Sequence, residues 1–69
     1  MAEHVYKLID LVGSSGVSVS DAIQNAIARA GATVRSIRWF EVVQVRGEVS
    51  GGKVARYQVT LKVGFTLDG

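Results

Sequence analysis

Hydrophobic residues along the chain follow two different spacings, which are separated by breaks that contain glycine. Residues 4–12, 36–50 and 53–67 are rich in β-branched and aromatic side chains, and this composition predicts three strands. Residues 19–34 instead place an apolar side chain every three or four positions, which predicts one helix. The order strand, helix, strand, strand predicts an α+β fold (β-α-β-β), with one helix packed on one face of a three-stranded antiparallel sheet.

The predicted helix has one apolar stripe and a polar opposite face. Ser18 or Ser20 is placed to cap its N-terminus, and Asp21 is placed to form a capping box with Ser18. The helix is expected to fade after Gly31. Its apolar stripe consists of Val19, Ala22, Ile23, Ala26, Ile27, Ala30 and Val34.

A pair of glycines separates the second and third predicted strands. Gly51-Gly52 tolerates positive φ at both positions, which suits a two-residue type I′ hairpin turn. Such a turn pairs Phe40 with Val63, Val42 with Leu61 and Glu41 with Lys62, so apolar side chains meet and opposite charges meet. The same register pairs Trp39 with Gly64 and Gln58 with Val45. The helix should then face alternate residues of the third strand: Ala55, Tyr57, Val59, Leu61, Val63, Phe65 and Leu67.

The sheet face opposite the helix should be partly apolar. Strict alternation places Trp39, Val43, Val45 and Val49 in one line on this face, and an exposed apolar surface of that extent is uncommon on monomers. Strands of about 13 residues extend roughly 40 Å, whereas a helix of about 15 residues extends roughly 22 Å. One helix cannot cover such a sheet, so we expect another protein chain or a ligand to cover the rest.

The composition points in the same direction. The chain has 69 residues, 48% of them hydrophobic, and no cysteine, so it is expected to form one small domain over residues 1–69 without disulfide bonds. Self-association is a common source of stability for so short a chain. The eight Lys and Arg residues are scattered among six acidic ones, which argues against nucleic-acid binding.

The chain start and the hydropathy indicate no membrane partner. Met1-Ala2-Glu3-His4 lacks the cationic segment and following apolar stretch of a signal peptide. No apolar run approaches the roughly 18 residues needed to span a membrane. A soluble, cytoplasmic protein is the expectation.

No catalytic or metal-binding group stands out. His4 is the only histidine and has no cysteine or obvious serine partner. Glu41 and Glu48 should lie on opposite faces of their strand, so no carboxylate pair forms. Residues 13–16 (Gly-Ser-Ser-Gly) precede the helix as phosphate-binding loops do, but they lack the P-loop and dinucleotide signatures, and a strand-to-helix connection is expected there. We therefore predict no enzyme and no metal site.

Trp39 is the side chain with the clearest chemical potential. An indole on a sheet face can stack on a planar π-system, or it can be an oligomer contact. Gly64 has no side chain and should leave space beside the indole for a flat ligand. Gln58, on the same face, offers a donor and an acceptor that suit the polar edge of a flavin or a nucleobase.

Several segments together resemble a known family. Residues 38–42 (RWFEV), 45–47 (VRG), 57–60 (YQVT) and 62–65 (KVGF), with 12–15 (VGSS) and 22–30 (AIQNAIARA), are similar to the dodecins. These are small flavin-binding proteins that assemble as hollow dodecamers. The resemblance covers almost the whole chain and has the predicted order of elements.

The resemblance implies a flavin-storing homododecamer that performs no turnover. In this family the tryptophan matching Trp39 stacks on the isoalloxazine, and pairs of flavins lie between tryptophans of symmetry-related chains. The glutamine matching Gln58 hydrogen-bonds the polar edge of the ring. Such binding buffers free riboflavin or FMN and quenches its photochemistry. Some members also bind coenzyme A, which is therefore a second ligand to consider. The alternatives are a structural self-assembly module without a ligand and a flavin-dependent enzyme.

The predicted register adds expectations for the binding site. Gln58 should lie roughly 20 Å from Trp39 along the sheet. The two residues that hold one flavin should therefore come from different subunits, unless a bulge or a strong curl of the sheet brings them together. Arg46 falls on the opposite face by strict alternation, yet it lies near the matching family site and is a candidate contact for the flavin phosphate or ribityl chain. Arg38, beside Trp39, is a similar candidate. Either arginine can instead be solvated or form an intersubunit ion pair, and Glu48 is a candidate for an intersubunit salt bridge.

Overall fold

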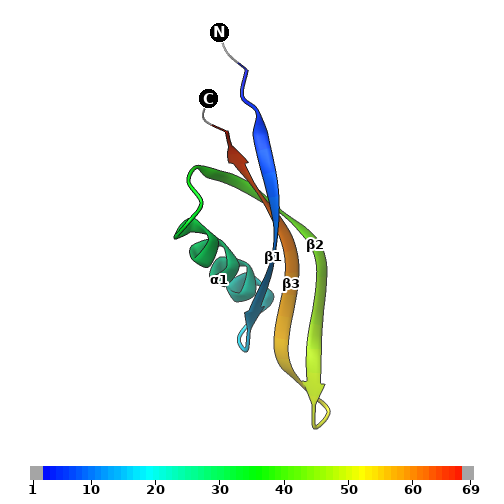
Figure 1. Ribbon diagram of the computed structural model, residues 1–69. Coiled ribbons are helices and arrows are strands. Elements are labelled where there is room, and N and C mark those ends of the chain that lie inside the picture. The colour runs from blue at the N-terminus through cyan, green and yellow to red at the C-terminus, as the bar shows by residue number, and fades with distance from the viewer. Residues whose placement is uncertain (1–2, 68–69) are drawn as a thin grey trace.

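The computed structural model describes residues 3–67 and contains one helix and three strands in the predicted order. The elements are β1 (Tyr6–Ser15), α1 (Val19–Gly31), β2 (Ile37–Ser50) and β3 (Lys53–Thr66), as Figure 1 shows. Met1, Ala2, Asp68 and Gly69, at the two ends of the predicted domain, lie outside the described residues. In the described part, no helix is both long enough and apolar enough to cross a membrane.

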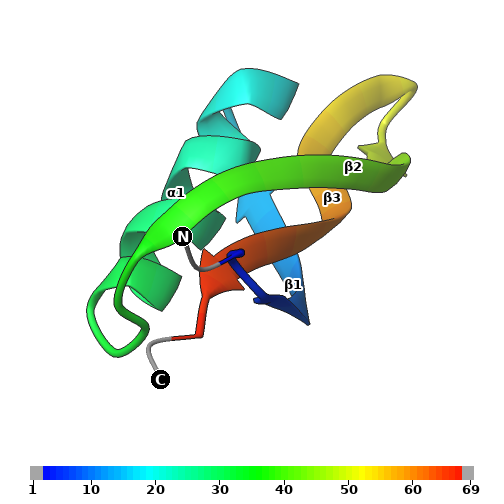
Figure 2. The same cartoon turned by 90° about the horizontal axis from the view of Figure 1, so that it is seen from above.

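The sheet has the order β1-β3-β2, and both strand pairs are antiparallel. Helix α1 lies on one face of the sheet, as predicted, and it packs mainly against β1 and β3 (Figures 1 and 2). The core consists of alternate residues of the middle strand and alanines of the helix: Val59, Leu61, Val63, Ala22 and Ala26. We call the sheet face that packs on α1 the helix side and the opposite face the outer face.

Strand β1 begins and ends later than predicted. It includes Gly13, Ser14 and Ser15, which the sequence had assigned to the strand-to-helix connection. A Cβ atom at Gly13 would overlap the backbone carbonyl oxygen of Ala22 and would lie 2.9 Å from Cβ of Ala26. Gly13 is therefore a strand residue that allows α1 to approach β1 closely, and only residues 16–18 connect the two elements.

The start of α1 confirms one of the two predicted caps. The Oγ atom of Ser18 accepts a hydrogen bond of 3.0 Å from the backbone N–H of Asp21. In the predicted capping box, the Asp21 carboxylate would accept a hydrogen bond from the backbone N–H of Ser18. The carboxylate instead accepts from the hydroxyl of buried Ser15, at 2.6 Å. The helix ends at Gly31 as expected, so Val34 was wrongly included in the helical stripe.

The hairpin between β2 and β3 has the predicted turn, and it has the predicted register next to the turn and again from Trp39 to Val42. Gly51 and Gly52 have φ of 59° and 76°, as a type I′ turn requires. Glu41 is opposite Lys62, and Phe40, Val42 and Trp39 have their predicted partners. The Lys62 amino group makes its ion pair with Asp10 of β1, at 2.9 Å.

Between these two stretches the register differs from the prediction by one residue. Val43 is an extra residue on β2, so Arg46 is opposite Gln58, where Val45 was predicted. A bulge of this kind reverses which face the following side chains occupy. The predicted register resumes at Val49, opposite Val54. Ala55, expected to face the helix, is the extra residue of β3 at this second shift.

The bulge corrects three expectations about the faces of β2. Val45 lies opposite the buried residue Val59 and therefore faces the helix side, so the predicted line of outer-face valines is wrong. Arg46 lies on the outer face, not on the opposite one. Glu48 also lies there, on the same face as Glu41, because both are opposite outward-facing residues of β3.

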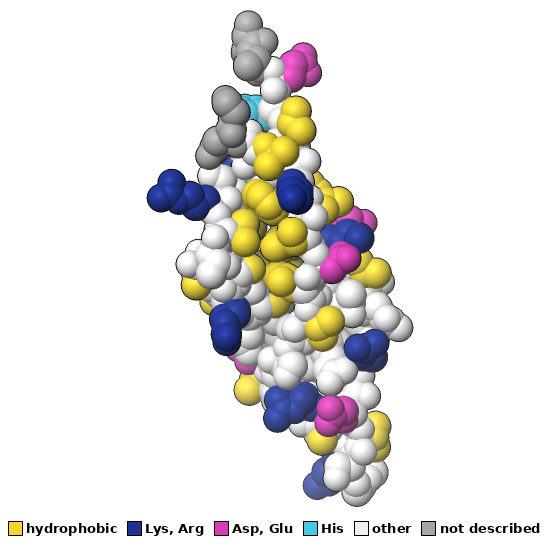
Figure 3. Space-filling view, viewed as in Figure 1, with side chains coloured by type: hydrophobic (Ala, Val, Ile, Leu, Met, Phe, Trp, Pro, Cys, Tyr) yellow, Lys and Arg dark blue, Asp and Glu magenta, His cyan; other side chains and the backbone are white. Residues whose placement is uncertain are grey.

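The structure leaves a large apolar surface uncovered beyond the reach of the helix, as expected, although Val45 belongs to the helix side of it and not to the outer face. Six hydrophobic residues are buried, whereas thirteen large ones are exposed in the described part of the chain. On the helix side of β2, beyond the reach of α1, Phe40, Val42 and Val45 are 47%, 39% and 51% exposed. Figure 3 shows exposed hydrophobic side chains gathered toward the end where both termini lie.

The molecule is elongated, at 56 × 20 × 14 Å. Its radius of gyration is 14.4 Å, whereas about 11 Å is expected for a compact chain of this length. The elongation results from the β2–β3 hairpin, which extends past the end of α1 (Figure 1). A shape of this kind is suited to burial against further chains.

Candidate functional site

The indole of Trp39 lies on the outer face against the backbone of the middle strand. Trp39 is near the start of β2, is opposite Gly64 and is 40% exposed. A Cβ atom at Gly64 would overlap the indole atoms Cε2 and Cζ2 and would lie 2.8 Å from Cδ2. The space predicted beside the indole is therefore filled by the indole itself, which rests on Gly64. A planar ligand would have to stack on the exposed part of the ring.

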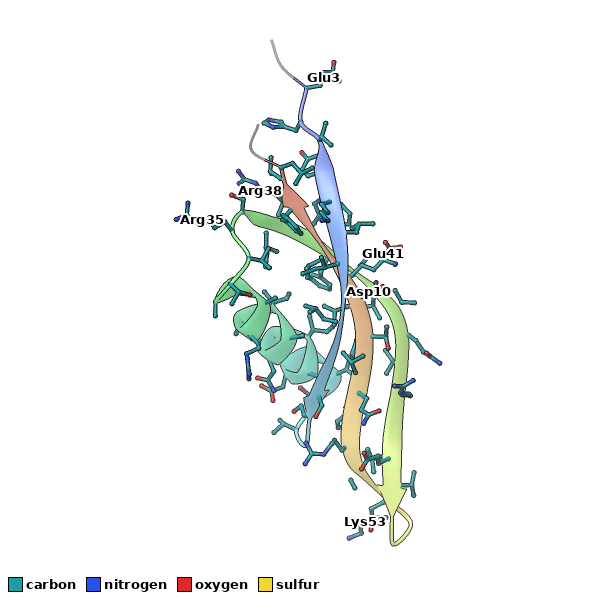
Figure 4. All side chains as sticks on the ribbon, in the orientation of Figure 1. Glu3, Asp10, Arg35, Arg38, Glu41 and Lys53 are labelled. Carbon is teal, nitrogen blue, oxygen red and sulfur yellow. The ribbon has the colours of Figure 1, made fainter. Side chains whose placement is uncertain are left out.

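Arg38 lies beside this tryptophan because of a second irregularity in β2. The register shifts between Ile37 and Trp39, which makes Arg38 an extra residue. Its Nε atom donates a hydrogen bond of 3.3 Å to Oγ1 of Thr66, two residues after Gly64 on β3. Figure 4 shows Arg38 near the C-terminal end of β3. The register shift thus accompanies a cation held at Thr66, two residues along β3 from the glycine under the indole.

Tyr6 is a neighbour of Trp39 that the sequence did not reveal. The two ring centroids are 6.4 Å apart, and the planes are inclined at 63°, an edge-to-face arrangement. Tyr6 belongs to β1, where it is opposite Thr66. The pairing of β1 with β3 is not set by a short turn, so its register could not be predicted from the residues. The one available signal was that Tyr6 is an aromatic residue in the first strand.

Gln58 and Arg46 form a separate polar cluster with Glu48 on the outer face. The Nε atom of Arg46 donates to Oε1 of Gln58 at 3.1 Å, and Nε2 of Gln58 donates to Oε2 of Glu48 at 3.3 Å. The bulge at Val43 brings these side chains together, since it turns Arg46 and Glu48 outward. Arg46 is thus held by a partner in its own chain.

The polar cluster and the tryptophan occupy different positions on the same face. Gln58 is six residues from Gly64 along β3, a separation of about 20 Å. Within one chain Arg38 adjoins Trp39 in sequence and the fold brings Arg46 to Gln58, but it does not bring the two pairs together. The expectation that Trp39 and Gln58 reach one flavin from different subunits stays a prediction.

The described residues offer few other sites. Within residues 3–67, no group of three or more His, Cys, Asp or Glu side chains is arranged to hold a metal ion. A groove of about 320 Å³ lies between α1 and β1. Its lining is largely apolar and includes Ile9, Ala30 and Arg29.

Fold and site together define a small β-α-β-β protein that exposes a tryptophan seated on a glycine of its outer sheet face. The family model "Dodecin" matches residues 5–68, and the chain belongs to the dodecin family. It is 48% identical over 64 residues to the dodecin of Thermus thermophilus, with 93% of each chain covered.

Solved structures agree with this assignment. The dodecin from Streptomyces coelicolor superposes with a TM-score of 0.93 at 46% identity, covering 100% of this chain and 99% of that one. The calcium dodecin of Mycobacterium tuberculosis, described as calcium chelating with a novel calcium-binding site, has a TM-score of 0.79 at 35% identity, covering 93% of this chain and 91% of that one.

Proposed function

We propose that this protein binds riboflavin or FMN by stacking the isoalloxazine on Trp39, and that it stores and sequesters the flavin. The observation that carries the proposal is the partly exposed indole, held against Gly64 in a member of the dodecin family. An aromatic side chain supported from one side presents a rigid surface to a planar ligand. The bound flavin supplies a redox-active chromophore, and an electron-rich indole in contact with it can quench its excited state.

The other residues of the proposed site would hold the edges of the flavin. Gln58 has an amide suited to the alternating donors and acceptors of the isoalloxazine edge. It would have to exchange one of its present hydrogen bonds, with Arg46 or Glu48, for the ligand. Arg38, next to Trp39 in the chain and bonded to Thr66, is proposed to attract a phosphate or hydrogen-bond a ribityl hydroxyl. Arg46 is proposed for the same role at the Gln58 end, in a neighbouring subunit.

The proposed assembly is a homododecameric shell in which neighbouring chains cover the bare helix side of β2. Native mass spectrometry of the full chain is expected to give the mass of a dodecamer, because a monomer would leave Phe40, Val42 and Val45 in water. A monomer as the only species would contradict the proposed assembly and, with it, sites shared between subunits.

A fluorescence titration tests the proposed ligand. Adding apo-protein to riboflavin or FMN should quench flavin emission, and Trp39→Ala should weaken binding about 5- to 150-fold, because stacking on an aromatic side chain contributes about 1–3 kcal/mol. Trp39→Phe is the matched control, since it keeps a smaller ring and should retain part of the binding. Equal affinity of Trp39→Ala and wild type would contradict the stacking site.

The same titration separates the alternatives. No flavin binding by the wild type would favour a structural self-assembly module, which the bare apolar surface supports independently. Oxidation of a reduced nicotinamide by the flavin complex would instead indicate a flavin-dependent enzyme. Coenzyme A is a second ligand to titrate because some dodecins bind it. Calcium binding is described for the calcium dodecin of Mycobacterium tuberculosis and is not part of this proposal.

A further inference from the structure

We propose that Tyr6 is a positioning residue of the stacking site, which fixes the orientation of the Trp39 indole before any ligand arrives. The inference rests on the proposed flavin binding for its ligand, but the contact itself belongs to the chain alone. Tyr6 and Trp39 meet edge to face, with ring centroids 6.4 Å apart. Such a contact stabilises one relative orientation of the two rings.

The contact spans the whole width of the sheet. Tyr6 is on β1 and Trp39 is on β2, the two edge strands, with β3 between them. Neighbouring strands are about 4.8 Å apart, so the backbones of the edge strands are separated by about 10 Å. The rings meet because Gly64 on β3 has no side chain to keep the indole off the strand. The site therefore takes the Tyr6 ring from β1, the backbone at Gly64 from β3 and the Trp39 indole from β2.

Tyr6 contacts this indole from the side, through the edge-to-face arrangement of the two rings. Gly64 supports the ring from below, and the Arg38 side chain is engaged with Thr66. With 40% of Trp39 exposed, the orientation of the indole depends on the contacts that its covered part makes. Immobilising a free side chain on binding lowers affinity by about 2- to 12-fold per residue. An indole that Tyr6 already holds avoids that loss.

The chain contains a single tryptophan, so indole fluorescence reports Trp39 alone. In the full, assembled apo-protein, Tyr6→Ala should increase the mobility of the indole, seen as a faster decay of emission anisotropy. The same variant should weaken riboflavin binding by about 2- to 12-fold. Tyr6→Phe keeps the ring and should restore both quantities to wild-type values.

Two controls distinguish positioning from a general structural effect. Val12→Ala truncates an exposed side chain on the same strand and face as Tyr6, about 20 Å away, and should change neither quantity. If Tyr6→Ala fails to assemble, Tyr6→Leu keeps apolar bulk without an aromatic edge, and it should show the same loss.

Several outcomes would overturn the inference. Unchanged anisotropy in Tyr6→Ala, or in Tyr6→Leu where that variant replaces it, would show that the tyrosine does not fix the indole. Faster anisotropy decay with unchanged riboflavin affinity would show that fixing the indole does not serve the ligand. If the wild type binds no flavin, the proposed function and the ligand part of this inference both fail, and the apo anisotropy alone decides whether Tyr6 orients Trp39.

Discussion

Gly64→Ala is expected to abolish flavin binding and to destabilise the chain. The added Cβ would occupy the position of the indole atoms Cε2 and Cζ2, so the ring must leave the surface of β3. Forced displacement of a packed side chain typically costs about 1–3 kcal/mol. The displaced indole also loses its contact with Tyr6, and the supported stacking surface disappears. Riboflavin titration and denaturant unfolding measure the two effects.

Two variants provide controls for Gly64→Ala. Gly31→Ala adds a Cβ that meets nothing within 4 Å, and it should leave binding unchanged. The double variant Gly64→Ala/Trp39→Ala should be less destabilised than the sum of the single variants, because the clash has lost one partner. Full flavin affinity in Gly64→Ala would show that flavin binding does not require the indole to rest on Gly64 of β3.

Gly13→Ala is expected to have the largest effect on stability. The new Cβ would overlap the backbone carbonyl oxygen of Ala22 and crowd Cβ of Ala26. A backbone atom cannot turn away as a side chain can, so α1 would have to move off β1. We expect a loss at the upper end of the range for overpacking, about 3 kcal/mol or more. Thermal and denaturant unfolding of the assembled protein provide the measurement.

The matched control for this position is Gly16→Ala. Its added Cβ would come no closer than 3.9 Å to another residue, and a change within about 0.5 kcal/mol is expected. A Gly13→Ala protein of wild-type stability would contradict the close approach of α1 to β1. Because Gly13 is on the helix side and Trp39 is on the outer face, any Gly13→Ala protein that assembles should still bind flavin.

Much of the fold could be predicted because local signals determine it. The step of three and four residues identified α1, and Gly51-Gly52 determined the turn and the pairing next to it. Ser18 was recognisable as a cap because its side chain acts on the next turn of the same helix. Each of these features depends on residues close in sequence or on a turn that fixes a register. The predicted pairing of Trp39 with Gly64 is correct because the extra residue Val43 on β2 offsets the extra residue Ala55 on β3.

The predictions from sequence failed where contacts between residues distant in the chain determine the structure. Val43 lies in a run of β-branched residues, and nothing local distinguishes a bulge there from regular pairing. Strict alternation therefore placed Arg46 and Val45 on the wrong faces. Gly13 resembled a turn residue, but its role is to admit a helix that packs on it later in the chain. The contact of Tyr6 with Trp39 could not be predicted, because no short turn sets the register between β1 and β3.

The bulge at Val43 makes β2 sensitive to the number of its residues more than to their identity. Length changes in most proteins are absorbed by loops, but removing one residue here would rotate Arg46 and Glu48 toward the helix side and bring Val45 to the outer face. Position 43 should accept many side chains and no deletion. In the evolution of this strand, insertions and deletions would change the chemistry of a whole surface in a single step.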